Sequence, residues 1–352
     1  AQGNTSVFQS METIYGSVNT DIVTLTGTGS TLVAGAIDLL TGSVNTDVVT
    51  LSGSGNTMQI SGIETLAGSS GTDAIALGAT GNTMVISGIE SLSGGLNTDI
   101  ITLASASNLT AEGLETLYGS SGSDAVTLGG RGTSVSVTEV ESLYGGVNTD
   151  IVTLAAMGNT MTVSKLETVY GGVNTDVITV TQGAVAFLGG AGADQITFAS
   201  TVSGNTVLFS SSTDGAAMGI ITGYDRIGNF HQSGDVIRLA GALRTALDDN
   251  SDGTIAVTSS AQSAVNLSTS EAELLTTAVS SGNLANTNFT GLITAMSTLA
   301  ATGGTALVVA NDGTNSAVYV VSDADTNGTI SASEVTLLGL FSSVILASGN
   351  IS

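Results

Sequence analysis

The stretch GIESLSGGLNTDIITLASASNLTA, residues 88–111, contains three short extended segments, IESLS, DIITL and NLTA, each of four or five residues. Gly, Ser and Asn fill the intervals between the segments, which is typical of turns. The apolar residues show no period of about 3.6, so the stretch predicts strands and turns and does not predict a helix.

This stretch is one copy of a repeat that runs through the first half of the chain. An aspartate recurs every 25 or 26 residues, at Asp21, Asp47, Asp73, Asp99, Asp124, Asp150 and Asp176. A second acid lies nine residues before each of them, at Glu12, Asp38, Glu64, Glu90, Glu115, Glu141 and Glu167. A Gly-Asn-Thr sequence or a variant of it places a third mark at Asn4, Asn56, Asn82, Asn108 and Asn159. A fixed period of this length is the sequence signature of a solenoid.

The repeat predicts an all-β fold, a right-handed parallel β-helix or β-roll solenoid over residues 1–200 with about 26 residues per coil. Each strand is expected to pair with its copy in the next coil, about 4.8 Å away. Side chains alternate along a strand, so the second and fourth residues after each aspartate form two inward apolar ladders. The first ladder is Val23, Val49, Ile75, Ile101, Val126, Val152 and Ile178, and the second is Leu25, Leu51, Leu77, Leu103, Leu128, Leu154 and Val180.

The remainder, residues 201–352, predicts a β-rich C-terminal domain with one or two short helices. The first helix is expected at 270–281, where Ser270 and Glu273 have the spacing of a capping box, and the second within 290–302.

Composition excludes several classes of function. Five Lys and Arg stand against 29 Asp and Glu in 352 residues, a net charge of −24, which repels nucleic acid and anionic membranes and attracts cations. The chain has no Cys and a single His, His231, so neither a thiol nucleophile nor a histidine pair is present, and we expect no enzyme activity. The apolar stretch near the C-terminus is broken by Ser, Gly and Asn and is too short for a membrane span.

The turn before each aspartate favours a cation site. The residue two positions earlier is Asn or Gly, which tolerate a left-handed backbone and could direct carbonyl groups at one point. Carbonyl and carboxylate oxygens are the ligands that calcium prefers. A single row of stacked aspartates would also repel by about 0.9 kcal/mol per neighbour in water, and cations between the coils would offset that repulsion. We therefore predict Ca²⁺ at the aspartate row.

The same turns resemble the glycine-rich nonapeptide G-G-x-G-x-D-x-U-x of the RTX (repeats-in-toxin) family. GGAGADQIT at 189–197 matches in full, and GGVNTDIVT at 145–153 and GGVNTDVIT at 171–179 match except for one Asn. The resemblance implies calcium held between coils by turn carbonyls, such as those of Gly145, Gly171 and Gly189, and by aspartate carboxylates. The carboxylates would be those of Asp21, Asp47, Asp73, Asp99, Asp124, Asp150, Asp176 and Asp194. The family uses about 18 residues per turn, and here only Asp176 and Asp194 have that spacing.

A different calcium motif lies near the C-terminus. DADTNGTISASE, residues 323–334, fits the EF-hand loop D-x-D-x-N-G-x5-E, in which Asp323, Asp325, Asn327, the Thr329 carbonyl and Glu334 would be ligands. The loop follows a predicted strand, SAVYVV, so a paired-helix EF-hand domain is not implied. The alternative interpretation is a turn that uses the same residues. DDNSDGTI, residues 248–255, is a weaker copy whose twelfth position is a serine.

One further pattern allows two interpretations. Five repeats have Val or Leu three positions before the aspartate, at Val18, Val44, Leu96, Val147 and Val173. In the same five repeats, the residue directly after the aspartate, whose side chain is expected to face outward, is Ile or Val. These pairs would either shield the turn locally or form a surface for lateral self-association.

The segments 221–241 and 306–352, which make up much of residues 200–352, resemble the C-terminal region of type I-secreted RTX proteins. This resemblance implies an uncleaved export signal and an extracellular, cell-surface location. The chain begins inside a repeat, so we expect a fragment or a processed product. The function we expect is a calcium-dependent structural protein, such as an S-layer or surface-filament subunit, that folds on binding calcium after secretion. The alternatives are the repeat stalk of a large adhesin and the secretion half of an RTX enzyme with its catalytic domain upstream. The expected partners are calcium ions, further copies of the chain and a cell-surface polysaccharide.

Overall fold

The computed structural model describes residues 3–155, 157–216, 222–260, 266–280, 284–285, 292–293 and 303–352. The chain divides into two compact units. Unit one comprises residues 1–153 and 160–166, and unit two comprises residues 154–159 and 167–352.

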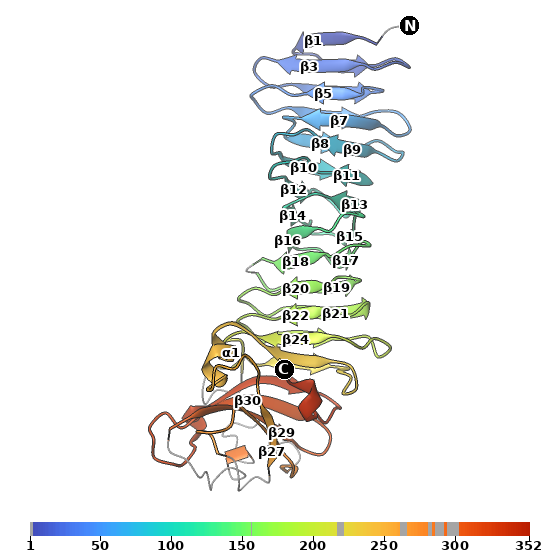
Figure 1. Cartoon of the computed structure of the whole chain (residues 1–352). Helices are drawn as coiled ribbons and strands as arrows, with labels where there is room; N and C mark the ends of the chain where they lie inside the picture. The colour runs from blue at the N-terminus through green and yellow to red at the C-terminus, as the bar shows by residue number, and fades with distance from the viewer. Residues whose placement is uncertain are drawn as a thin grey trace. The chain divides into compact units, whose positions relative to one another are not determined.

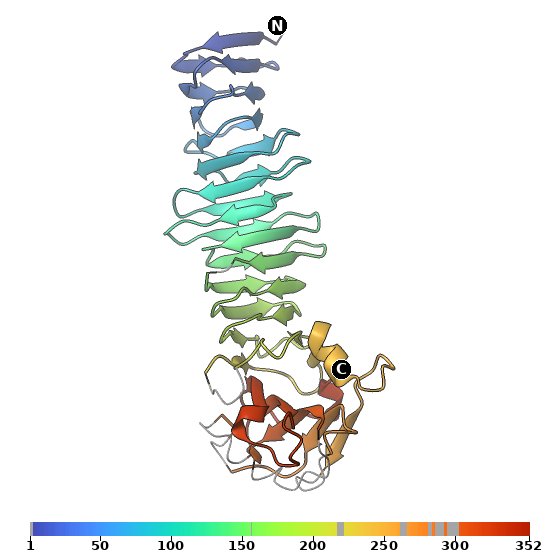
Figure 2. The same cartoon turned by 90° about the vertical axis from the view of Figure 1, so that its left-hand side faces the viewer.

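Unit one is a parallel β-solenoid in which successive strands alternate between two sheets and stack one above another (Figures 1 and 2). The first sheet contains β1 (Thr5–Gln9), β3 (Ile22–Thr26), β5 (Leu39–Thr41), β7 (Thr57–Ser61), β9 (Ala74–Leu77), β11 (Ser91–Ser93), β13 (Asn108–Glu112), β15 (Ala125–Leu128), β17 (Ser142–Tyr144) and β19 (Thr160–Ser164). The second contains β2 (Thr13–Tyr15), β4 (Thr31–Gly35), β6 (Val48–Leu51), β8 (Thr65–Ala67), β10 (Thr83–Ser87), β12 (Ile100–Leu103), β14 (Thr116–Tyr118), β16 (Ser134–Thr138) and β18 (Ile151–Leu154), whose last residue belongs to unit two. The predicted parallel solenoid is therefore confirmed.

The predicted coil of 26 residues is wrong, because the sequence repeat and the coil are different lengths. Each repeat contains three strands, whereas each coil contains two strands, one in each sheet. One repeat is thus one and a half coils, and a coil averages about 17 residues. The pairing register agrees: Thr5 lies beside Ile22 and Thr31 beside Val48, each 17 residues further along the chain.

The inward ladders that alternation predicts lie in the core of unit one, beside further buried residues such as Leu40, Leu66 and Leu92. Val49, Ile101 and Val126 are fully buried, and the members of the leucine ladder are at most 4% exposed. Successive repeats place these residues in alternate sheets, so the two sheets face each other across one apolar layer. This burial is the main source of solenoid stability, since a two-stranded coil cannot bury its apolar face alone.

Unit two continues with coils of the same kind. In one sheet β21 (Val177–Gln182), β23 (Gln195–Thr197) and β25 (Asp225–Gly228) pair in parallel. The other sheet contains β20 (Thr168–Tyr170), β22 (Ala186–Leu188), β24 (Thr206–Phe209) and β26 (Val236–Leu239). Parallel pairing of this type therefore extends past residue 200, as far as Leu239, although the sequence repeat is no longer recognisable there.

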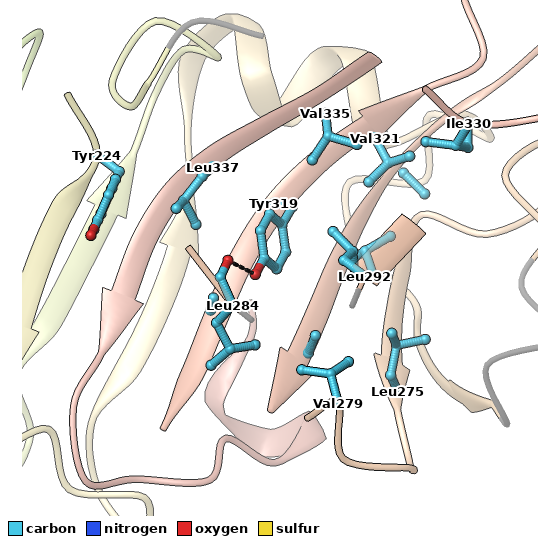
Figure 3. Packing of buried hydrophobic residues seen from close by; sticks show 14 of the residues in the cluster. Tyr224, Leu275, Val279, Leu284, Leu292, Tyr319, Val321, Ile330, Val335 and Leu337 are labelled. Carbon is cyan, nitrogen blue, oxygen red and sulfur yellow. Dashed lines mark hydrogen bonds between the residues drawn. The ribbon is translucent and has the colours of Figure 1, made fainter. Parts of the chain in front are cut away.

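The end of unit two changes from parallel to antiparallel pairing. After α1 (Gly241–Leu247), the strands β27 (Val257–Ser260), β28 (Ala272–Leu275) and β29 (Thr305–Asn311) pair in parallel. The strands β30 (Ser316–Ser322) and β31 (Val335–Phe341) then extend the sheet in antiparallel order. Their apolar side chains surround Tyr319, whose hydroxyl donates a hydrogen bond to the Leu284 carbonyl (Figure 3).

The expected β-rich C-terminal part with a short helix is confirmed, but the predicted helix at 270–281 is wrong. Residues 272–275 form a strand, and the Ser270 hydroxyl bonds to the Glu273 carboxylate at 2.6 Å outside any helix. Residues 272–274 pair with residues 307–309 of β29, and this tertiary contact outweighs the weak helix propensity. The one α-helix in the described part of the chain is α1, at a position where the sequence does not predict a helix. The second predicted helix, within 290–302, lies almost wholly outside the described residues.

Candidate functional site

The three polar marks of the repeat occupy one structural position in successive coils. Asn56 precedes β7, Asp73 precedes β9 and Glu90 precedes β11, and the pairing register places these three residues one above another. The interval is 17 residues in both steps, which equals one coil. Each edge of the solenoid therefore carries a polar ladder with the order neutral residue, aspartate, second acid.

Asp99 shows how the ladder is bonded. Its Oδ1 accepts hydrogen bonds from the backbone N–H and the side-chain amide of Asn82 in the coil before, at 3.0 and 2.8 Å. Its Oδ2 accepts from the Gly95 N–H within the same turn at 2.6 Å. Its own N–H donates to Oε2 of Glu115 in the coil after, at 2.7 Å. Asp99 thus ties three consecutive coils together, through its carboxylate to the coil before and through its N–H to the coil after.

The same bonds recur along the described solenoid. The neutral residue donates its N–H to the aspartate Oδ1 at Asn4, Ser30, Asn56, Asn82, Ser107, Thr133 and Asn159. The residue four before the aspartate donates to Oδ2 at Ser17, Ser43, Ser69, Gly95, Ser120, Gly146 and Gly172. The repeat aspartates are at most 3% exposed. Since backbone donors favour the charged form, the Ser17 N–H holds the pKa of Asp21 below its usual value.

Two expectations about these turns are wrong. The aspartates do not form a single row, because a repeat of one and a half coils places them at alternate edges, so Asp47 is next to Ser30 and Glu64. The left-handed backbone does not occur at the Asn before the aspartates. Among the described residues it occurs two positions before the second acid, with φ of 54–64° at Ser10, Ala36, Gly62, Gly88, Gly113, Glu139 and Lys165.

The first glycine of each turn allows neighbouring coils to approach closely. A Cβ at Gly145 would lie 1.9 Å from the carbonyl oxygen of Lys165, and one at Gly171 would lie 2.0 Å from that of Gly189. Such contacts are impossible, so only glycine fits beneath the carbonyl group of the next coil at these positions. This close approach accounts for the glycines, and calcium binding by their carbonyls stays a prediction.

Asp194 differs from the other turn aspartates because it lies between two buried aspartates, Asp176 in the coil before and Asp225 in the coil after. Its N–H donates to Oδ1 of Asp225 at 3.1 Å, while its own Oδ2 is buried and has no hydrogen-bond partner. A Cβ at Gly189 would lie 2.4 Å from that Oδ2 and 3.0 Å from Oδ2 of Asp225, so both oxygens converge on this glycine. Burial, with the charge of Asp176 nearby, raises the pKa of Asp194 to about 7. Burial and the Asp194 charge raise the pKa of Asp225 well above its usual value.

The predicted EF-hand-type loop forms a compact acidic cluster between β30 and β31. Asp323, Asp325 and Glu334 each place a carboxylate oxygen within 4.8 Å of the others. Two ligands of one calcium ion, each 2.3–2.6 Å from it, lie up to about 5 Å apart, so this donor set fits calcium. The loop is held in shape by the Asn327 and Gly328 N–H groups, which donate to Asp323 at 3.2 and 3.1 Å. Together with the Gly303 N–H, they lower the pKa of Asp323.

The other side chains predicted as ligands in this loop are also oriented by hydrogen bonds. Oδ1 of Asn327 accepts from the Thr329 N–H at 2.7 Å. Both oxygens of Glu334 are oriented by the loop, because Oε1 accepts from Ala324 at 3.0 Å and Oε2 from Ser331 at 2.9 Å. The loop leads into a 3-10 turn, Ala332–Glu334, and then into β31, in agreement with the expectation of a loop without a helix pair.

The aliphatic residues at the turns lie at the outer tips of the coils. Val18 and Val44 are 99% and 98% exposed, and Leu96, Val147 and Val173 are exposed as well. Side chains this exposed do not pack on the strand residue that follows, so the interpretation as a local shield is wrong. Val44, Leu96 and Val147 all precede strands of the second sheet, three coils apart.

Comparison with protein-family models, curated proteins and solved structures found no match for the chain. In the described part of the chain, no helix is long and apolar enough to cross a membrane. Three features of the described residues are candidates for a functional role. They are the polar ladders, the acidic loop at 323–334, and the row of exposed aliphatic side chains at the turns.

Proposed function

We propose that the chain is a calcium-binding structural protein of the cell exterior, a surface-layer or filament subunit, whose solenoid associates laterally with further copies. The observation that carries the proposal is the row formed by Val44, Leu96 and Val147, here called the apolar row. These side chains are 98%, 90% and 88% exposed at equivalent turns of one edge. With three coils between them, at about 4.8 Å per coil, the spacing is about 14 Å.

A regular apolar row suits association with an identical row. A second solenoid has the same spacing, so one contact in register brings the others into register too. Isolated apolar residues on a surface need no explanation, but equivalent positions repeated at one edge are unusual in a monomeric protein. The chain itself offers the polar alternative, because Ser70 and Ser121 take this position at the opposite edge.

Calcium enters the proposal through the loop at 323–334 and the Asp194–Asp225 pair. The loop supplies three carboxylates and a preformed backbone. The pair supplies two converging oxygens, one of them without a partner, and a bound cation would offset their burial. The net charge of −24 makes cation binding favourable in general and keeps free subunits apart in its absence. Export by a type I route and an extracellular location rest on the resemblance to RTX proteins.

The test compares self-association of the full chain with that of a variant lacking the apolar row, Val44→Ser, Leu96→Ser and Val147→Ser. Light scattering coupled to gel filtration would be recorded with a chelator and with millimolar calcium. The wild type is expected to form assemblies in calcium, and the variant is expected to stay monomeric at the same concentration.

The matched control changes three exposed residues of the same turns, Thr46→Ser, Thr98→Ser and Thr149→Ser. This variant should assemble as the wild type does. Assembly of the serine variant at wild-type concentration would refute the role of the apolar row, and a wild type that remains monomeric in calcium would refute lateral assembly itself.

A further inference from the structure

The loop after α1, residues 248–256, has the same backbone conformation as the acidic loop at 323–334. Ser251 and Thr326, the fourth residues, have φ of 56° and 58°. Gly253 and Gly328, the sixth residues, have φ of 80° and 76°. The eighth residue of each loop is a buried isoleucine, Ile255 or Ile330. The sequence predicts a weaker copy of the loop at 323–334, and the backbone angles at the fourth and sixth positions match those of that loop.

The internal hydrogen bonds of the two loops also correspond position by position. In the loop after α1, Asp248 accepts from the N–H groups of Asp252 and Gly253 at 3.1 and 2.9 Å. Asn250 accepts from the Asp252 N–H at 2.8 Å, and Asp252 accepts from the Thr254 N–H at 2.8 Å. In the other loop the first, third and fifth residues accept the same bonds. Each side chain is therefore oriented as its counterpart is.

The twelfth position, which is Glu334 in one loop, is Ser259 in the other. A glutamate from another strand takes its place. Oε2 of Glu334 accepts from the N–H of the ninth loop residue, Ser331, at 2.9 Å. In the loop after α1, Oε2 of Glu271 accepts from the N–H of the ninth residue, Ala256, at 2.5 Å.

Parallel pairing of β27 and β28 brings this glutamate to the loop. Val257 lies beside Ala272, so the residue before β28, Glu271, lies beside the last residue of the loop, Ala256. The Ala272 N–H donates back to the Ala256 carbonyl at 3.2 Å, which fixes the register. A side chain 15 residues away thus reaches the loop through the sheet.

The second oxygen of Glu271 has no partner. Oε1 is buried without a hydrogen bond, and the residue is only 2% exposed. The ladder glutamates accept a similar bond, for example Glu141 from the Asp124 N–H, but Glu141 is exposed and water can solvate it. Leaving a carboxylate oxygen buried and unpaired costs free energy, which a cation would offset.

We propose a second calcium site in the loop after α1, formed by Asp248, Asn250, Asp252, the Thr254 carbonyl and Glu271, the residue before β28. Three carboxylates and neutral oxygens are a donor set for a hard divalent cation of calcium size. Among the described residues only the loop at 323–334 already holds three carboxylates within 4.8 Å, so the second site closes by a side-chain movement of Glu271 and binds more weakly.

The neighbouring Arg244 does not compete for these oxygens. Its guanidinium donates to the carbonyl of Gly253, the sixth residue, which is not among the proposed ligands. This bond joins the last turn of α1 to the loop. The site depends on neither lateral assembly nor the turn aspartates, so its failure would leave the proposed function standing.

Hydrogen–deuterium exchange of the full chain, with chelator and with calcium chloride, tests the site locally. Calcium should slow exchange in peptides that cover residues 248–256 and 268–275. Glu271→Gln and Asp248→Asn should raise the calcium concentration for half-maximal protection there at least tenfold, while peptides covering 323–334 respond as in the wild type.

The matched control is Asp249→Asn, which removes one charge at an exposed loop position that is not a proposed ligand. It should keep the protection within about twofold of wild type. Absence of calcium protection at 248–256 in the wild type would overturn the site, and so would an unchanged response in Glu271→Gln. Equal loss in the Asp249 control would show a general charge effect and would also overturn it.

Discussion

Replacing Asp99 with alanine tests whether the ladder aspartates hold the coils together by hydrogen bonding. The change removes the acceptor of three donors, the N–H and side-chain amide of Asn82 and the N–H of Gly95. Hydrogen bonds to a charged acceptor contribute about 1.5–3 kcal/mol each, and they are not additive. Asp99 is 0% exposed, so water does not replace the lost acceptor, and we expect a loss of about 3–5 kcal/mol.

The measurement is urea unfolding in chelator, combined with exchange rates of individual amides. Solenoids unfold locally as well as globally, so exchange at the Gly95 and Asn82 amides is the sharper readout. Asp99→Asn keeps one oxygen and should lose less stability, about 1.5–3 kcal/mol. Thr98→Ala, an exposed change in the same turn, should stay within about 0.5 kcal/mol of the wild type.

Calcium separates the two roles that the aspartate could have. If hydrogen bonding is its role, the loss caused by Asp99→Ala is equal in chelator and in calcium. If the turn also binds an ion, as the resemblance to RTX proteins implies, the loss is larger in calcium, because the wild type alone gains binding free energy. Unchanged stability in chelator together with unchanged exchange at Gly95 would refute the hydrogen-bond reasoning.

Three further outcomes are expected. Gly68→Ala should destabilise the protein by about 2–4 kcal/mol in urea unfolding, because a Cβ there would lie 1.7 Å from the Gly88 carbonyl oxygen. The control Gly130→Ala should be nearly neutral, because no atom lies closer than 4.0 Å to a Cβ at that position. The pKa of Asp194 is raised to about 7, so its carboxyl stays protonated to a higher pH in the folded state than in the unfolded state. The stability in chelator should therefore fall as the pH rises from about 4 to about 7. Thermal unfolding should show that Asp194→Asn flattens this slope and is more stable than wild type at pH 8, and a less stable variant would contradict the effect of burial. Glu334→Gln should weaken calcium binding in calorimetry at least about tenfold without lowering stability in chelator, and equal destabilisation in chelator would indicate a purely structural role.

The strand pattern and the core could be predicted from the sequence because both are local. Alternation along DIVTL-type segments determines which side chains face inward, and residues such as Val49 and Leu103 are buried as expected. The coil length could not be read from the repeat, since a 26-residue period says nothing about how many strands close a turn. The 17-residue interval from Asn56 to Asp73 and from Asp73 to Glu90 was the available signal.

The acidic cluster was predicted where its residues are contiguous in sequence, and the other candidate groups were missed because their residues are not. The loop at 323–334 contains all its predicted ligands within twelve residues, so spacing alone indicated that Asp323, Asp325 and Glu334 lie together. Glu271 lies in another segment and reaches its loop only through the register of β27 and β28. The Asp194–Asp225 pair likewise depends on a longer coil, in which the two aspartates are 31 positions apart, beyond any repeat spacing.

The repeat of one and a half coils explains why the chain needs three kinds of polar residue at one ladder position. An edge meets a given segment of the repeat only every third coil, so each aspartate is separated from the next by two other residues. The residue before it donates, as Asn82 does, and the residue after it accepts, as Glu115 does. At one edge the order is broken where Asp176, Asp194 and Asp225 follow one another directly, the first two each donating an N–H to the next carboxylate, and burial raises the pKa of Asp194 and of Asp225 there. We therefore expect this buried succession of aspartates, rather than the net charge, to determine where a cation would stabilise the described solenoid most.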